Sequence, residues 1–183
     1  MVENGGSMKT LVRIFLALSL LGLLSACTIY LRSSSLSLGF RGSFDLSPIP
    51  IITRLEPDRG TGASYRPGER IRFVISLTQA GYVTLVSTEA SGYSNTLGTY
   101  YLEAGTTLLP PPGQGADYYL VDPGSPYGLE RIRAIYTNTQ PRGYLSIRGT
   151  FSNDEFNNQI RIYFERNLAQ IRDVAESYFY VSP

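Results

Sequence analysis

The sequence predicts a mainly β fold: a β-sandwich-like domain with one C-terminal amphipathic helix that is followed by a final strand. Many short apolar runs are separated by turns rich in Gly and Pro, which is typical of sandwiches. One stretch near the C-terminus has helical spacing instead. The 14 tyrosines and 8 phenylalanines suit strands and surfaces that contact other molecules.

The N-terminal segment has the features of a lipoprotein signal. Lys9 provides a basic start. It is followed by an apolar stretch from Ile14 to Leu24, which is too short to span a bilayer. Ala26 and Cys27, the only cysteine, come next. We expect cleavage after Ala26, which removes residues 1–26, and lipidation of Cys27. An ordinary signal peptide with a chance cysteine is the alternative.

Acylation of Cys27 would anchor the mature chain to a membrane outside the cytoplasm, since two or more acyl chains hold a protein stably. Thr28 stands where a bacterial inner-membrane retention signal usually has Asp. We therefore expect a lipid-anchored location at the outer membrane of the cell envelope.

Composition excludes several classes of chemistry. The chain has no histidine, and no lysine follows residue 26, so imidazole metal sites, catalytic triads and Schiff-base lysines are impossible in the mature chain. Arginine and acidic residues balance after cleavage, which disfavours nucleic-acid binding. We predict no enzyme activity, no cofactor and no metal, although carboxylate chemistry and oxygen-ligated cations stay open.

Residues 27–50 are predicted to form a lipidated tether with a possible edge strand. Leu36, Leu38 and Phe40 alternate with small residues, which indicates a strand. This strand either begins the domain or is offered to the sheet of a partner protein. Residues 51–183 are predicted to form a single β-rich domain.

Strands are predicted within this domain from apolar runs bounded by turn residues. They cover residues 51–55, 70–77, 82–87, 95–102, 106–109, 118–121, 131–137 and 177–181. Ala80 and Gly81 connect the second and third runs, which predicts a hairpin between them.

A helix is predicted from about Asn153 to about Asp173. Ser152 and Glu155 have the spacing of a capping box, and Phe151 and Phe156 occupy the hydrophobic-staple positions. Its apolar stripe is interpreted as a core face and comprises Phe156, Ile160, Tyr163, Phe164, Leu168, Ile171 and Ala175.

A short internal repeat suggests a basic surface. Glu69-Arg70-Ile71-Arg72 recurs as Glu130-Arg131-Ile132-Arg133. The strand period places the two arginines of each copy on one face and the isoleucine on the other. If the strands were neighbours, Arg70, Arg72, Arg131 and Arg133 would form a patch for an anionic surface or partner. Alternatively, each arginine pairs with a carboxylate on a solvated face.

Tyr100, Tyr118 and Tyr127 form a second candidate contact surface. Outward-facing rings at these positions would stack on sugars or fill a pocket of a partner. The alternative is packing in the core and at sheet edges. The loop carboxylates follow no EF-hand pattern and form no evident acid–base pair.

Several segments resemble a known bacterial module. Pro57–Gly60, Tyr65–Phe73, Gly81–Leu85, Ala104-Gly105 and Pro126–Glu130 are similar to the domain-of-unknown-function family numbered 4384, found in bacterial envelope proteins. The resemblance implies a β-sandwich-like module and carries over no catalytic residues.

With its lipidation signal and no lysine after residue 26, the chain also resembles small envelope lipoproteins of Deinococcus-type bacteria, which accompany S-layer or outer-membrane proteins. We therefore expect a non-enzymatic accessory or structural subunit of such an assembly. One alternative is a module that binds envelope polysaccharide or lipid headgroups. A copper superoxide-dismutase-like subunit is disfavoured, because copper sites of that kind need imidazoles.

Overall fold

The computed structural model describes residues 40–183, which form two packed β-sheets and one helix. A six-stranded sheet has the order β10 (Arg148–Thr150), β6 (Tyr93–Leu102), β5 (Gly81–Thr88), β9 (Gly128–Thr137), β11 (Arg172–Val181) and β2 (Ser64–Tyr65). A three-stranded sheet contains β1 (Ile52–Pro57), β4 (Phe73–Leu77) and β7 (Gly105–Leu109). β3 (Arg70–Ile71) and β8 (Tyr119–Leu120) form a separate small ladder.

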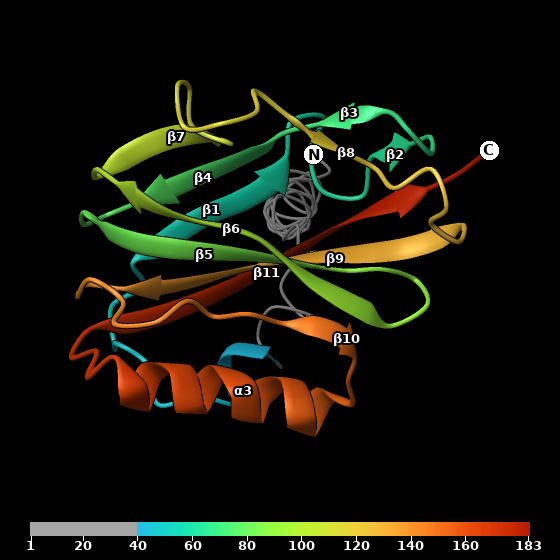
Figure 1. Cartoon of the computed structure of the whole chain (residues 1–183). Coiled ribbons are helices and arrows are strands. Elements are labelled where there is room, and N and C mark those ends of the chain that lie inside the picture. Colours follow the sequence, from blue (N-terminus) through green and yellow to red (C-terminus); the bar gives the residue numbers. More distant parts are fainter. Residues whose placement is uncertain (1–39) are drawn as a thin grey trace, which may run out of the picture. The chain divides into compact units, whose positions relative to one another are not determined.

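The layers follow the order three-stranded sheet, six-stranded sheet, helix (Figure 1). All strand pairs are antiparallel except β11 with β2. The helix α3 (Asn153–Arg166) covers the outer face of the larger sheet, and the final strand β11 follows it. The predicted β-sandwich-like fold with one C-terminal helix is therefore confirmed.

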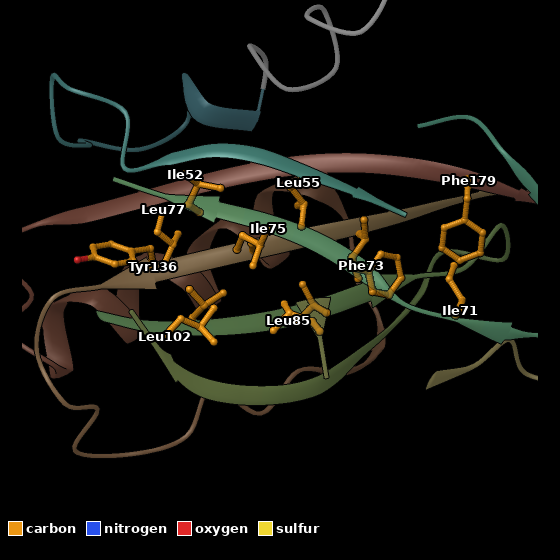
Figure 2. Close-up of a cluster of buried hydrophobic side chains, with 14 of the residues drawn as sticks. Ile52, Leu55, Ile71, Phe73, Ile75, Leu77, Leu85, Leu102, Tyr136 and Phe179 are labelled. Atoms are coloured by element: carbon orange, nitrogen blue, oxygen red, sulfur yellow. The ribbon is translucent and has the colours of Figure 1, made fainter. Parts of the chain in front are cut away.

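The main core lies between the two sheets. In β4, Phe73, Ile75 and Leu77 are buried while the residues between them are half-buried, as expected for a sheet with one solvated face. They pack against residues of the larger sheet that include Leu85 and Leu102 (Figure 2). Burial of these aliphatic and aromatic side chains holds the two sheets together.

A second core lies between the larger sheet and α3. Val86, Ile135 and Val174 come from three neighbouring strands and pack against apolar side chains of the helix, among them Ile160 and Phe164. β5 and β9 are therefore covered on both faces, which explains why so many of their residues are buried.

The predicted hairpin between residues 70–77 and 82–87 is wrong, because the two runs belong to different sheets. β4 pairs with β1 and β7, whereas β5 pairs with β6 and β9. The connection at Ala80 and Gly81 packs tightly on Tyr136, whose hydroxyl donates to the Ala80 carbonyl at 2.8 Å. β5 is buried on both faces at its central position, while alternate residues of β4 are only half-buried.

The N-terminus of α3 is capped as the sequence predicts. Ser152 is the N-cap, its Oγ accepts from the Glu155 amide, and the Glu155 carboxylate accepts from the Ser152 amide at 2.8 Å. Phe156 is buried and Phe151 is partly buried in the second core. The capping box and the two packed rings fix where the helix begins.

The helix ends at Arg166, and the predicted end near Asp173 is wrong. Asn167 is the C-cap, and Leu168 has a φ of 49°, which no residue of an α-helix adopts. Leu168, Ile171 and Ala175 therefore do not belong to the helical stripe. The final strand begins at Arg172 rather than at Ser177, and it pairs with β9 along its length.

We expect Ser152→Ala to lower the free energy of unfolding by about 1 kcal/mol, since it removes the acceptor for the Glu155 amide. Urea unfolding followed by circular dichroism of the full chain in mild detergent measures this change. Ser152→Asn is the matched control, because asparagine also caps helices and should cost only a few tenths of a kcal/mol. Equal stability of the alanine variant and the unmodified protein would show that the cap contributes nothing.

The segment before β1 belongs to the domain from Phe40 onward. Phe40 lies in a helical turn, not in the predicted edge strand, and its ring contacts those of Phe44 and Phe156 at centroid distances of 5.3 and 6.3 Å. The remaining residues of the predicted tether and edge strand, 27–39, lie outside the described residues. Within residues 40–183 no helix is long and apolar enough to cross a membrane.

Candidate functional site

A cavity of about 590 Å³ opens where the small β3–β8 ladder lies beside the ends of the central strands. Ile71, Phe73 and Phe179 form its apolar floor at one end of the main core (Figure 2). Its polar lining includes Ser87, Glu89, Tyr93, Asn95, Tyr119, Asp122, Ser125, Glu130 and Arg148. We call it the Glu130 cavity.

Glu130 is the most unusual residue of this cavity. It lies on β9 opposite Phe179 of β11, and only 5% of its surface is exposed. Its Oε1 atom has no hydrogen-bond partner, and neither has the Oγ atom of Ser125, which is 8% exposed. Buried polar atoms are nearly always paired in native proteins. Two unsatisfied atoms in the wall of one cavity therefore point to a ligand that satisfies them.

The environment of Glu130 shifts its titration strongly. Burial, together with the nearby charges of Glu89 and Asp122, raises the pKa of this carboxyl to about 7. The Ser125 hydroxyl is near enough to oppose the rise but makes no hydrogen bond of ordinary geometry with the carboxyl. Strongly perturbed carboxyl groups in clefts are characteristic of functional sites.

Two tyrosines give the cavity rigid aromatic walls. The hydroxyl of Tyr119 shares a hydrogen bond of 2.7 Å with that of Tyr100, and burial raises the pKa of Tyr119. The hydroxyl of Tyr93 accepts from Nε of Arg148 at 3.2 Å. These contacts hold the two hydroxyls and leave the rings in the cavity lining.

The first pair of predicted arginines lies apart from the second. Arg70 is on β3, which pairs with β8, and its guanidinium lies over the ring of Tyr118 at 4.3 Å. Arg72 follows it, is half-buried, and approaches the Pro110 carbonyl at 3.5 Å. Because β3 is not a neighbour of β9, the condition for a shared patch of four guanidiniums is not met.

Arg131 and Arg133 lie on β9, where the helix covers the second face. Arg133 is almost fully buried, donates to Glu176 at 2.5 Å and to Thr88 at 2.8 Å, and stacks on Phe156 at 4.4 Å. Arg133 is therefore a core residue and not a surface contact. Arg131 is half-buried, opposite Thr88 and Tyr178.

The predicted tyrosine contacts have three different environments. Tyr100 is half-buried and reaches the cavity only through its bond to Tyr119. Tyr118 lies under Arg70, and Tyr127 is 62% exposed in the turn before β9. None of the three lines the Glu130 cavity.

Two other predicted features lie elsewhere. Ala26 and Cys27, the predicted cleavage and lipidation residues, are outside the described part of the chain. Across residues 40–183 no group of three or more His, Cys, Asp or Glu side chains is arranged to hold a metal ion.

The sequence contained a signal for Glu130 that the repeat obscured. Glu130 shares its strand parity with Ile132, Ala134 and Tyr136, which form the apolar face of β9. A carboxylate at a position of that parity is expected to be buried. Ser125 lies in the turn before β9, and Tyr93 is the first residue of β6. No periodic pattern in the sequence identifies either residue.

The comparisons with known proteins give one match. Residues 64–140, which extend from β2 to just past β9, match the family model described as domain of unknown function, DUF4384. No curated protein and no solved structure matches the chain. The segment contains β3, β8 and Glu130, so most of the cavity wall falls within it. The predicted resemblance to the domain of unknown function 4384 is therefore confirmed, over residues 64–140 of this chain.

Proposed function

We propose that this chain is a non-enzymatic, lipid-anchored protein of the cell envelope whose β-sandwich domain binds an envelope saccharide in the Glu130 cavity. The observation that supports this function best is the pair of buried, unpartnered polar atoms, Glu130 Oε1 and Ser125 Oγ, in the wall of an open cavity. The expected acyl anchor at Cys27 would keep the domain next to such a ligand.

The lining of the cavity suits a saccharide. One face of a sugar ring is apolar and packs on an aromatic ring, while its hydroxyls need carboxylate and amide partners. Tyr93 and Tyr119 offer the aromatic faces, and Asn95, Glu89 and Asp122 offer the polar groups. A volume of about 590 Å³ is within the range of small-ligand sites.

We expect Tyr93→Ala to weaken saccharide binding about tenfold or more. The test is a glycan array followed by calorimetric titration, with the full lipidated chain in mild detergent. Tyr101→Ala is the matched control, because Tyr101 is on the same strand, is 49% exposed and does not line the cavity. Its binding should equal that of the unmodified protein.

Three outcomes would contradict the proposal. If Tyr118→Ala or Tyr127→Ala weakened binding and Tyr93→Ala did not, the site would be the tyrosine surface and not the cavity. Hydrolysis of the bound saccharide would overturn the non-enzymatic assignment. Lack of binding on the array, together with recovery of a stoichiometric outer-membrane or S-layer partner from the envelope, would favour the accessory-subunit function instead.

A further inference from the structure

The buried carboxylates of the described domain follow a pattern with one exception. The Asp173 side chain is fully buried and lies 2.5 Å from a guanidinium nitrogen of Arg41. The Glu176 side chain is 5% exposed and lies 2.5 Å from Nε of Arg133. A buried carboxylate without a partner is costly, so pairing with a cation is the rule. Glu130 is buried to the same degree, and no arginine in residues 40–183 pairs with it.

The internal repeat sharpens this contrast. Glu69, the counterpart of Glu130 in the first copy, forms an ion pair with Arg59 and accepts from the Arg66 amide at 2.8 Å. These contacts lower the pKa of Glu69. Glu130 begins the second copy of the same local sequence and lines the cavity, yet its buried Oε1 atom has no donor. The cation that Glu69 finds within the chain is missing for Glu130.

The cavity wall carries an excess of acidic residues, which also favours a cationic ligand. Glu89, Asp122 and Glu130 line the cavity, and none of them forms an ion pair in the described part of the chain. Asp122 accepts from the Gly124 amide at 2.7 Å and Glu89 accepts from the Ser91 hydroxyl at 3.2 Å. Arg148 is the one cationic lining residue, and its Nε donates to Tyr93.

We infer that the saccharide bound in the Glu130 cavity carries a protonated amine, which takes the position of the missing cation beside Glu130. This inference rests on the proposed saccharide binding and adds the class of sugar. An ammonium group has three donors, enough to reach Glu130 Oε1 and the Ser125 hydroxyl together. It also offsets the negative charge of Glu89 and Asp122.

The test uses two probes that differ at one group, which is a charged ammonium in the first and a neutral acetamide in the second. The first is the 2-aminoethyl glycoside of N-acetylglucosamine, whose alkylamine stays protonated at pH 8, and the second is the same glycoside with its amine acetylated. Both are titrated calorimetrically into the full lipidated chain in mild detergent at pH 8. We expect the amine to bind about tenfold more tightly than its acetylated form.

Glu130→Gln keeps the shape of the side chain and removes its charge, so the affinity ratio of the two probes should fall to about one. Glu103→Gln is the matched control, because this exposed carboxylate lies outside the cavity, and it should keep the tenfold ratio. A cooperative thermal transition establishes that each variant is folded.

The outcomes separate this inference from the proposed function. If the unmodified protein bound both probes with equal affinity, the proposed saccharide binding would stand, but the inference that the saccharide carries an amine would be wrong. A preference for the amine that survives Glu130→Gln would overturn the role of Glu130. Binding of neither probe, together with a blank glycan array, would remove the proposed function itself.

Discussion

The free energy of unfolding of this protein is expected to fall by about 2–3 kcal/mol as the pH rises from 5 to 8, because of Glu130. Burial raises the pKa of this carboxyl to about 7, whereas an ordinary glutamate has a value of 4.5. Between these two values the folded protein holds a proton that the unfolded chain has released. The stabilisation is complete below pH 4.5 and is lost as the pH approaches and passes 7.

The size of the effect follows from the distance between the two pKa values. Each pH unit of difference corresponds to about 1.4 kcal/mol, and full titration over 2.5 units would give about 3 kcal/mol. Hydrogen bonds lower the pKa values of Glu69 and Glu155. These two groups therefore change stability below pH 4.5 and not between pH 5 and 8.

Urea unfolding of the full chain in mild detergent at several pH values measures this dependence. The chain has no tryptophan, so far-ultraviolet circular dichroism is the suitable signal. Glu130→Gln should abolish most of the decline, and Glu103→Gln should retain it. A decline of the same size in Glu130→Gln would assign the pH dependence to other groups, and constant stability of the unmodified protein would contradict the raised pKa.

Local sequence signals predicted the elements of this fold well where one face of an element is solvated. The alternation of Phe73, Ile75 and Leu77 and the capping box at Ser152 are each complete within a few residues. Such signals need no knowledge of the neighbouring strands, so the mainly β class, most strands and the start of the helix could be predicted.

Long-range pairing could not be predicted in the same way. The pattern of β5 fits a hairpin with β4 as well as a central position between β6 and β9, and only the arrangement of the whole core decides between them. The repeat placed Arg131 and Arg133 on one face of β9, but it could not show that α3 covers that face.

The candidate site was predictable only in part, for the same physical reason. Glu130 could have been identified as buried from its parity on β9, but its lack of a partner depends on residues from other elements. Glu69 forms its ion pair with Arg59, which is outside the repeat, whereas the repeat's own Arg133 pairs with Glu176 of β11. The walls of the cavity are likewise formed by residues that are far apart in the chain.

Asp173→Ala is expected to cause the largest loss of stability, about 3–5 kcal/mol, because it breaks a buried ion pair and leaves buried amides without acceptors. Asp173 lies at the start of β11, fully buried, and its Oδ2 accepts from the Ile51 and Ile52 amides at 2.7 and 2.8 Å. Its Oδ1 atom accepts from the Val174 amide at 2.9 Å and pairs with Arg41.

This single carboxylate thus joins the start of β1, the segment at Arg41 and the beginning of the final strand. Helical periodicity alone would place Asp173 at an exposed helix end, where its removal costs little, so the variant also tests the observed strand boundary. Asp45→Ala is the matched control, because Asp45 pairs with Arg172 at 2.9 Å but is 93% exposed, and it should lower stability by less than about 1 kcal/mol. If urea unfolding showed equal losses for the two variants, the buried role of Asp173 would be wrong.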